Sequence, residues 1–438
     1  MHSDKPKVLH ELAGRPLLAH VIDCARQLQP EKIIVVYGFG GETVPAAIND
    51  SDIVLVKQEV QLGTGHAVKQ ALPHLDTNSM ALVLLGDVPL IGATNCGRLL
   101  EQAQHGLALF TVEKSNPAGY GRIVRSPDGN VTAIVEEKDA TNEQRAIREV
   151  NTGIMALPAQ RLAGWLALLE NLNAQGEYYL TDIVAMAARD GVRITACLAQ
   201  DEWEVTGVNC KGDLASLERV YQQRQASQLM RKGVTLRDPA RLDVRGVLVT
   251  GRDVSIDVGC VFEGRVELGD DVRIGSYCVI KDAIIGRGST VAPFTHIDGA
   301  VTGCESHIGP YARLRPGTKL ADETHIGNFV EIKNSQIGAE SKINHLSYIG
   351  DATLGKNVNI GAGTITCNYD GANKHRTEIE DNVFIGSDTQ LVAPVKVGAG
   401  ATIGAGSTIT KDAPAGALTL SRARQGTLAN WKRPEKKK

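Results

Sequence analysis

One histidine in the carboxy-terminal half, His345, stands among polar residues whose types could do chemistry. Imidazole titrates near neutral pH, so His345 could remove a proton from an attacking amine. The simpler alternative, for this residue alone, is an exposed position on a repeat. Its polar neighbours lie on or next to successive repeats: Arg313, Arg315, Lys333, Tyr348, Asn359, Asn368, Tyr369, Lys374 and Ser387. Arginine suits a phosphate ligand because its planar fork pairs with phosphate oxygens.

A second group of candidates lies in the amino-terminal half, where apolar runs end. Segment 58–67 is Gly-rich and opens a helix, so its backbone N–H groups could approach a base or a phosphate. Asp87 follows the apolar run 80–85, where open α/β sheets bind ligands and where Mg²⁺ could be held with phosphate. Each could instead be an ordinary turn, and Asp87 a helix N-cap. Further polar clusters lie at 119–122, 136, 151–153, 177–182 and 208–209.

A six-residue period beginning near residue 250 predicts the scaffold of the carboxy-terminal candidates. Aliphatic residues recur six apart, and the longest run is Ile379, Ile385, Leu391, Val397, Ile403 and Ile409. No helix has this period, whereas a flat strand plus a tight corner does, and three such units close one triangular coil. Each coil buries its apolar face only against its neighbours. We therefore expect a left-handed parallel β-helix of hexapeptide repeats rather than an antiparallel sandwich, with segment 366–374 as an inserted loop.

The amino-terminal half shows a different pattern. Residues 1–205 alternate short β-rich runs with amphipathic stretches, which is typical of a mostly parallel α/β sheet. Strands are expected at 32–37, 52–56, 80–85, 107–112 and 194–198, and a helix at 41–49. We expect three parts: an α/β domain over 1–211, a linker helix over 212–232, and the β-helix with a basic tail over 233–438.

Composition narrows the functional class. The 438 residues carry a formal net charge of −3, so there is no chain-wide basic field to hold nucleic acid or an anionic membrane. The eight cysteines are scattered without metal-ligand spacing and are interpreted as reduced thiols. No apolar run approaches the length of a membrane span, and segment 2–7 is polar, unlike a signal peptide. We expect a cytoplasmic protein with no nucleic-acid or membrane partner.

The order of these motifs resembles the nucleotidyltransferases that join a sugar 1-phosphate to a nucleoside triphosphate. The resemblance covers the whole chain and is closest to the bifunctional family that couples an N-acetylglucosamine-1-phosphate uridylyltransferase to a glucosamine-1-phosphate N-acetyltransferase. The matching motifs are Pro6-Lys7, Gln58, Gln61-Leu62-Gly63-Thr64, Gly86-Asp87, Gly119-Tyr120-Gly121, Glu136, Asn151-Thr152-Gly153 and Asn209, followed by the β-helix.

This resemblance implies roles for residues of the Rossmann-like α/β domain. It implies that Asp87 and Asn209 hold Mg²⁺ and that Lys7 meets phosphate. Contacts to UTP and to the sugar nucleotide are implied for Gln58, Gln61, Gly63, Thr64, Gly121, Glu136 and Asn151. These residue types fit the chemistry, since a sugar phosphate and a triphosphate repel each other until cations neutralise them and the site aligns them for in-line displacement.

The resemblance also implies an acetyltransferase site in the β-helix. His345 is implied as the general base. Contacts to glucosamine 1-phosphate are implied for Arg315, Lys333, Tyr348, Asn359, Asn368, Tyr369 and Lys374. The acetyl-CoA groove is implied to be lined by Ala362, Ser387, Ala405 and Arg422. Small residues in that groove would leave room for the pantetheine arm. Hexapeptide acyltransferases generally assemble as trimers with sites between neighbouring prisms, so a homotrimer is expected.

Two other functions remain open from the sequence. One is a sugar-1-phosphate nucleotidyltransferase whose β-helix only builds the oligomer, as in ADP-glucose pyrophosphorylases. The other is a non-enzymatic scaffold or regulatory subunit, because fold alone does not imply activity. His345 and the loop residues Asn368 and Tyr369 distinguish them, since a purely structural prism does not require that constellation.

The family's first strand and its Gly-rich phosphate loop, ending in G-T-R-M, would lie upstream of Met1, which looks like the Met that closes that motif. We expect pyrophosphate release from UTP and N-acetylglucosamine 1-phosphate only when the upstream residues are restored, because that loop supplies an arginine and backbone donors to the triphosphate. Assaying both forms side by side tests this. Comparable activity in the two would show that the loop is dispensable.

Overall fold

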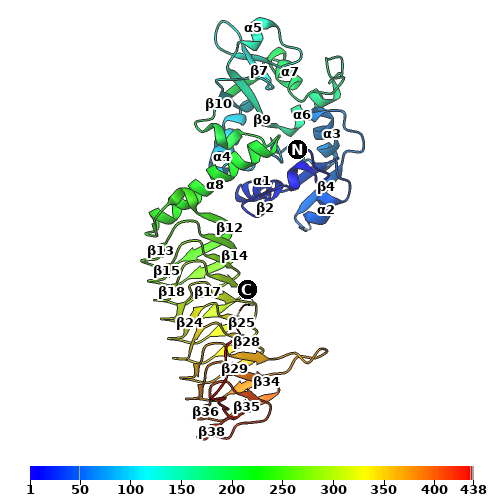
Figure 1. The fold of residues 1–438 in the computed structure, drawn as a ribbon. Helices are drawn as coiled ribbons and strands as arrows, with labels where there is room; N and C mark the ends of the chain where they lie inside the picture. Colours follow the sequence, from blue (N-terminus) through cyan, green and yellow to red (C-terminus); the bar gives the residue numbers. More distant parts are fainter. Residues whose placement is uncertain (49, 435, 437–438) are drawn as a thin grey trace. The chain divides into compact units, whose positions relative to one another are not determined.

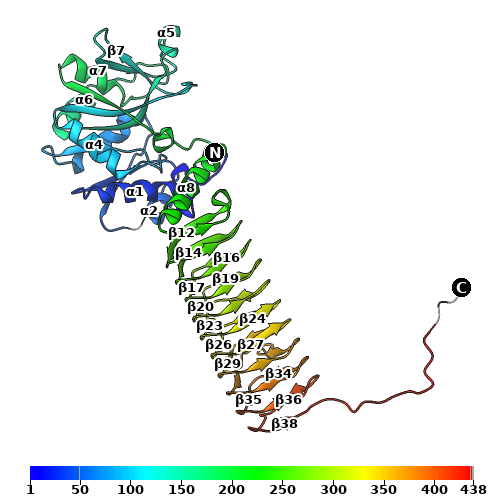
Figure 2. The same ribbon diagram turned by 90° about the vertical axis from the view of Figure 1, so that its left-hand side faces the viewer.

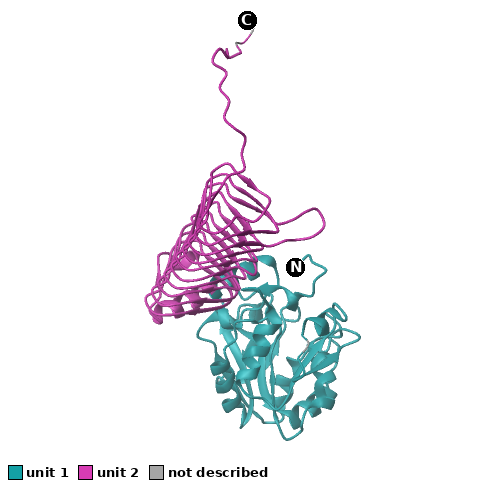
Figure 3. Cartoon of the chain, turned by 90° about the horizontal axis from the view of Figure 1, so that it is seen from below, with its two compact units in different colours: residues 1–221 teal, residues 222–438 magenta. Residues whose placement is uncertain are grey.

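The computed structural model describes residues 1–48, 50–434 and 436, which divide into two compact units, 1–221 and 222–438 (Figure 3). The division falls inside helix α8 (Lys211–Arg231), the stretch predicted as a single helix. Of the basic tail expected at 433–438, residues 435, 437 and 438 lie outside the described residues. No helix in the described part of the chain is long and apolar enough to cross a bilayer.

Unit 1 contains a six-stranded sheet in the order β10-β6-β9-β7-β8, with β5 also paired to β9, and a separate parallel pair β3-β4 (Figure 1). Its elements are β1 (Glu11–Leu12), β2 (Arg15–Pro16), α1 (Leu17–Gln27), β3 (Ile33–Tyr37), α2 (Thr43–Ala47), β4 (Ile53–Lys57), α3 (Thr64–Ala71), β5 (Met80–Val83), α4 (Ala93–Ala103), β6 (Gly106–Glu113), β7 (Arg122–Arg125), β8 (Val131–Val135), α5 (Asn142–Arg145), β9 (Glu149–Pro158), α6 (Ala159–Ala167), α7 (Asp182–Arg189) and β10 (Arg193–Leu198). The five predicted strands are confirmed to within two residues at each end.

Helices cover both faces of the central strands because side chains alternate along a strand. In β6, Leu107 and Leu109 belong to a buried cluster that includes residues of α6 and α7. The intervening Ala108 and Phe110 belong to another cluster with residues of α4. A strand that is buried on both faces has a continuous run of apolar residues, and these runs are what predicted the central strands from the sequence.

The expectation of a mostly parallel sheet is wrong for the larger sheet. Within it β10 runs parallel to β6, but β9 pairs antiparallel with β5, β6 and β7. The chain reverses at the hairpin of β7 and β8 and returns through β9. A strand buried on both faces gives the same apolar run in either direction, so the pattern carried no sign of this reversal.

Unit 2 is a parallel β-helix whose short strands form two continuous ladders (Figure 2). One ladder has eleven strands: β11 (Thr235–Leu236), β13 (Ser255–Ile256), β15 (Arg273–Ile274), β18 (Thr290–Val291), β21 (His307–Ile308), β24 (His325–Asn328), β27 (Lys342–His345), β30 (Asn359–Ile360), β33 (Phe384–Ile385), β36 (Thr402–Ile403) and β38 (Leu418–Thr419). Their inward aliphatics, such as Ile343 and Ile385, are fully buried, which confirms the hexapeptide prediction.

The other ladder has seventeen strands and forms the rest of each coil. They are β12 (Asp243–Thr250), β14 (Val261–Leu268), β16 (Val279–Lys281), β17 (Ile284–Ile285), β19 (His296–Asp298), β20 (Val301–Thr302), β22 (Arg313–Leu314), β23 (Lys319–Leu320), β25 (Glu331–Lys333), β26 (Gln336–Ile337), β28 (Tyr348–Gly350), β29 (Ala352–Leu354), β31 (Ile365–Cys367), β32 (Thr377–Ile379), β34 (Gln390–Val392), β35 (Val395–Val397) and β37 (Thr408–Ile409). Residues 420–434 continue beyond the last coil without helix or strand.

The predicted insertion is a short hairpin that projects from the coils (Figures 1 and 3). Tyr369 and Lys374 form an isolated antiparallel bridge, and the His375 N–H donates to the Asn368 carbonyl at 2.9 Å. The Asp370 carboxylate accepts from the backbone N–H groups of Ala372 and Asn373 and so closes the turn. The loop therefore has a defined shape.

Neighbouring isoleucines of β17 provide a matched test of the packing. Ile285 points inward with 1% of its surface exposed, whereas Ile284 points outward with 45% exposed. We expect Ile285→Ala to lower the free energy of unfolding of unit 2 by about 2–5 kcal/mol and Ile284→Ala by under about 1 kcal/mol. Denaturant unfolding followed by circular dichroism measures both. Equal losses would contradict the inward assignment of Ile285.

Candidate functional site

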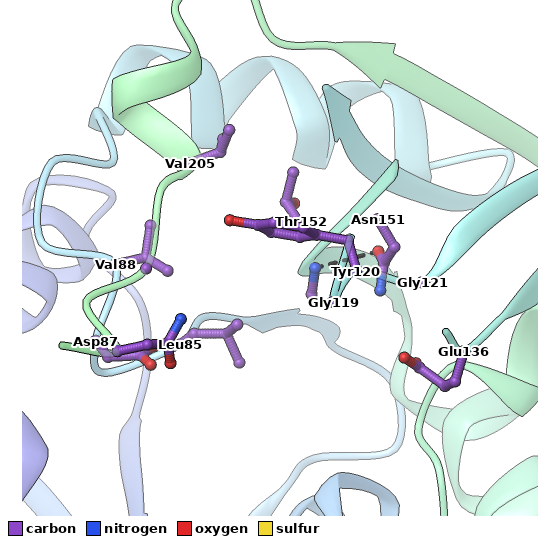
Figure 4. Close-up of a pocket in the computed structure, with 13 residues that line it drawn as sticks. Leu85, Asp87, Val88, Gly119, Tyr120, Gly121, Glu136, Asn151, Thr152 and Val205 are labelled. Atoms are coloured by element: carbon purple, nitrogen blue, oxygen red, sulfur yellow. Dashed lines mark hydrogen bonds between the residues drawn. The ribbon is translucent and has the colours of Figure 1, made fainter. Parts of the chain in front are cut away.

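Unit 1 holds a pocket of about 230 Å³ that brings together five of the residues predicted from the sequence. Its lining comprises Leu85, Asp87, Val88, Gly119, Tyr120, Gly121, Glu136, Asn151, Thr152, Gly153, Val205, Gly207 and Asn209. Figure 4 shows Asp87 and Glu136 on opposite sides of this pocket. The pocket therefore has a carboxylate at each side, with polar backbone and the Asn151 amide between them.

Hydrogen bonds between separate turns hold the pocket in shape. Asp87 lies just beyond β5, and its carbonyl accepts from the Val208 N–H at 2.9 Å, which brings the segment containing Asn209 beside it. On the other side, the Asn151 N–H donates to the Gly121 carbonyl at 2.8 Å. The pocket is thus assembled from five stretches that are separate in the sequence.

Lys7 bridges the two predicted metal ligands, which both line the pocket. Its Nζ lies 2.5 Å from Asp87 Oδ2 and donates to Asn209 Oδ1 at 3.1 Å. Two oxygens therefore converge on one point that a cation already occupies. Mg²⁺ prefers such oxygen ligands and commonly takes one or two from the protein and the rest from phosphate and water. The donor set fits Mg²⁺, and no group of three or more His, Cys, Asp or Glu side chains in the described residues offers a richer one.

Glu136 forms the opposite wall. Burial raises the pKa of Glu136, and the neighbouring carboxylates of Asp182 and Asp139 raise it further. A hydrogen bond from the Thr181 hydroxyl at 2.9 Å lowers this pKa, but by less than burial raises it. Gly121 keeps this carboxylate accessible. A Cβ at Gly121 would lie 2.9 Å from Ile134 Cγ2 and 3.3 Å from both Glu136 carboxylate oxygens.

Arg122 was not predicted as a site residue, yet it supports this wall. It is 1% exposed, and its guanidinium donates to the Tyr120 carbonyl and, at 2.6 Å, to Glu137 Oε2. The same carboxylate oxygen accepts from the Gly119 N–H at 3.3 Å. Arg122 therefore holds the backbone on which Gly121 lies. Its position inside the Gly-Tyr-Gly-Arg motif was the available signal.

Gln58, Gly63 and Thr64 do not line the pocket. They form the turn before α3, where Gly63 has φ +105° and lies against the Tyr178 carbonyl, 2.7 Å from where a Cβ would stand. The Thr64 hydroxyl accepts from the Leu180 N–H at 3.1 Å, and Gln58 Nε2 donates to the Gly63 carbonyl at 3.3 Å. This turn is bound to segment 177–180 as a separate polar cluster of unit 1.

In unit 2 a single column of residues contains His345 and the three small residues predicted for the acetyl-CoA groove. The column is Asn328, His345, Ala362, Ser387 and Ala405, each two positions after an inward isoleucine of the eleven-stranded ladder. Each of the first four carbonyls accepts a backbone N–H from the next coil, at 3.1, 3.3, 2.7 and 2.8 Å in order. These residues therefore stack along one edge of the prism. Arg422 reaches the end of the column, donating to the Ala405 carbonyl at 2.8 Å.

Asn328, which the sequence reasoning missed, sets the tautomer of His345. His345 Nδ1 lies 3.0 Å from Asn328 Oδ1. An amide oxygen can only accept, so Nδ1 carries the proton and Nε2 keeps its lone pair. His345 is exposed, which leaves Nε2 accessible to a substrate. The signal that could have found Asn328 is its place one coil earlier, at the same position of the repeat.

Basic side chains gather beyond the corner of the coil that follows His345, where β28 begins. The amine of Lys333 lowers the pKa of Lys374 through a hydrogen bond and through charge repulsion, so the two cationic groups are close. Tyr348 pairs with Glu331 in the ladder, and Glu331 accepts from Arg315 at 2.8 Å. This brings four of the predicted residues to one patch, where positive charge is concentrated.

Asp351 was also missed, and it organises the same patch. Burial alone would raise the pKa of Asp351. The pKa is nevertheless lowered, because the Asn334 and Asn368 amides donate hydrogen bonds to the carboxylate and the positive charges of Lys333 and Lys374 lie nearby. Both amides lie 2.5 Å from its carboxylate oxygens. Asn368 is 8% exposed and uses its side chain to hold the base of the inserted loop.

Two further residues predicted to contact the sugar are Asn359 and Tyr369. Asn359 faces outward from β30, immediately before the inward Ile360. The Tyr369 hydroxyl donates to the Gly371 carbonyl at 2.6 Å within the inserted loop, and the Tyr369 side chain is 60% exposed. Asn359 is partly buried, whereas Tyr369 is open to solvent.

Family models match both units of the chain. The MobA-like NTP transferase domain family matches residues 1–236, and the bacterial transferase hexapeptide family (six repeats) matches residues 248–282 and 376–411. Among solved structures, HddC from Yersinia pseudotuberculosis, crystallised with GMP-PN, is similar with a TM-score of 0.37 and 16% identity, over 50% of this chain and 92% of that chain.

Full-length relatives identify the family. The chain is 66% identical over 438 residues to "Bifunctional protein GlmU" of Methylobacillus flagellatus, covering 100% of this chain and 95% of that protein. It is 61% identical to the protein of the same name from Cupriavidus pinatubonensis, covering 100% of this chain and 96% of that protein. With a nucleotidyltransferase fold joined to a hexapeptide β-helix and this identity over the full length, the chain belongs to the GlmU family of bifunctional proteins.

Proposed function

We propose that the chain serves UDP-N-acetylglucosamine synthesis through two reactions. The β-helix transfers acetyl from acetyl-CoA to glucosamine 1-phosphate, and the α/β unit transfers uridylyl from UTP to N-acetylglucosamine 1-phosphate with release of pyrophosphate. The observation that carries the first reaction is the oriented His345 at the head of a column of small residues. We assign the α/β domain to 1–211, the linker helix to 212–232 and the acetyltransferase to 233–438.

The acetyl-transfer site would work through proton removal and positioning. His345 Nε2 accepts a proton from the sugar amine as the amine attacks the thioester carbonyl, and the thiol of coenzyme A leaves. Arg315, Lys333 and Lys374 bind the phosphate, while Tyr348, Asn359, Asn368 and Tyr369 contact the sugar. Ala362, Ser387 and Ala405 leave space for the pantetheine arm along the column, and Arg422 binds at its end.

In the uridylyl site, Asp87 and Asn209 would hold Mg²⁺, which would neutralise charge on the triphosphate. Lys7 supplies a second positive charge to the phosphates. Gly121, Glu136 and Asn151 bind the sugar, and Gln58, Gly63 and Thr64 bind the uracil. The attacking oxygen is already a phosphate anion, so this site requires alignment and charge neutralisation and no nucleophilic side chain.

The exposed position of the acetyl-transfer column supports a homotrimer. His345 is open to solvent in a single chain, and a neighbouring prism would wall it and exclude water. We also propose a cytoplasmic location, because acetyl-CoA and UTP are available there and the cysteines of the described chain are unpaired.

Replacing the base tests the acetyl-transfer assignment. We expect His345→Ala to lower thiol release from acetyl-CoA and glucosamine 1-phosphate by at least about 100-fold, because no other group accepts the amine proton there. Thiol release is followed with a chromogenic disulfide. Unchanged turnover in a variant that elutes at the parent's size would remove His345 from the mechanism.

Asn328 should act only through His345. We expect Asn328→Ala to lower kcat by about 10–100-fold while the KM for acetyl-CoA stays within about twofold, since the ring loses its oriented tautomer but the groove is intact. Asn357→Ala is the matched control, because that exposed asparagine donates to Asn382 on another corner of the coils at 3.0 Å. An equal effect of both variants would contradict a specific role for Asn328.

A further inference from the structure

The ammonium of Lys7 stands where the oxygens of Asp87 and Asn209 converge. It contacts both, at 2.5 Å and 3.1 Å, while other contacts hold the backbones of the two residues. Asp87 is held by its carbonyl through the Val208 N–H. Asn209 is held by its own N–H, which donates to Asp213 Oδ2 at 2.8 Å. The site therefore keeps its shape by backbone contacts, while Lys7 fills its centre from a separate segment.

A metal ion and this ammonium cannot share the site. Two cations within a few ångströms repel strongly in a partly buried setting, and Lys7 already contacts an oxygen of each proposed ligand, Asp87 Oδ2 and Asn209 Oδ1. Lys7 has the means to leave, because its side chain is flexible and 39% exposed. Any metal that binds Asp87 and Asn209 must therefore first displace Lys7, and the cost of displacement weakens its binding.

We propose that Lys7 is an internal competitor of the divalent cation, which makes metal binding conditional on the phosphate ligand. This inference rests on the proposed function, since it takes Asp87 and Asn209 as the metal site. An anionic phosphate attracts the displaced ammonium and offers oxygens to the metal. By linkage, phosphate then raises metal affinity by the same factor as metal raises phosphate affinity. The metal thus enters together with the phosphates rather than resting in the free protein.

Binding of Mn²⁺ to the full chain, as a spectroscopic substitute for Mg²⁺, tests this without any enzyme assay. Electron paramagnetic resonance counts free Mn²⁺ in a titration without nucleotide. We expect Lys7→Met to bind Mn²⁺ about tenfold more tightly than the parent chain, because the methionine keeps the length but removes the charge. Lys7→Gln is a second variant in case the first does not fold.

Lys5→Met is the matched control for net charge. Lys5 lies two residues away and pairs with Glu11 at 3.4 Å on the surface. Replacing it removes one positive charge near the metal site but no contact to Asp87 or Asn209. We expect its Mn²⁺ affinity to stay within about twofold of the parent, as screened surface charges predict. A gain in Lys7→Met no larger than that in Lys5→Met would overturn the proposal.

Asp87→Asn separates failure of this inference from failure of the proposed function. We expect it to reduce Mn²⁺ affinity in the parent and in Lys7→Met alike, because the shared ligand is lost. If Asp87→Asn binds Mn²⁺ as tightly as the parent, the metal site itself is wrongly assigned. If Asp87→Asn weakens binding but Lys7→Met does not strengthen it, the site stands and the competition by Lys7 is refuted.

Discussion

Parallel hydrogen bonding from each coil to the next fixes the position of every side chain in the β-helix. Strands in such a ladder lie about 4.8 Å apart, so residues at one position of the repeat stack into columns. The inward column forms the core and stabilises the stack. The column two positions later runs from Asn328 through His345 to Ala405 along one edge. His345 and the small residues Ala362, Ser387 and Ala405 therefore come into line without a dedicated scaffold.

Unit 1 achieves positioning by a different means. Its pocket is built from turns, each held by a few hydrogen bonds to a turn distant in sequence. The most buried of these supports is Arg122, which links the Tyr120 carbonyl to Glu137. A buried arginine with a carboxylate partner is costly to form and more costly to break. Arg122 and Glu137 together therefore hold the turn from Gly119 to Gly121 in one shape.

The sequence predicted what depends on local periodicity and could not predict what depends on contacts. A six-residue period has one structural solution, so the β-helix and its inserted loop followed from it. The antiparallel strands β7, β8 and β9 were not among the predicted strands, and an apolar run carries no sign of strand direction. Asn328, Arg122 and Asp351 were missed for a related reason. Each acts through a partner 15 to 17 residues away whose proximity only the folded chain creates.

The two proposed phosphate sites differ in how they carry positive charge. In the β-helix Lys333 and Lys374 lie together, and the single Asp351 carboxylate beside them offsets only one of their two charges, so these three side chains carry net positive charge before a ligand arrives. That arrangement suits one phosphate group bound without a metal. In unit 1 Asp87 neutralises Lys7, so the pocket gains positive charge only when the pair separates. A triphosphate needs more charge than one lysine supplies, and releasing Lys7 while admitting a divalent cation provides it at the moment of binding.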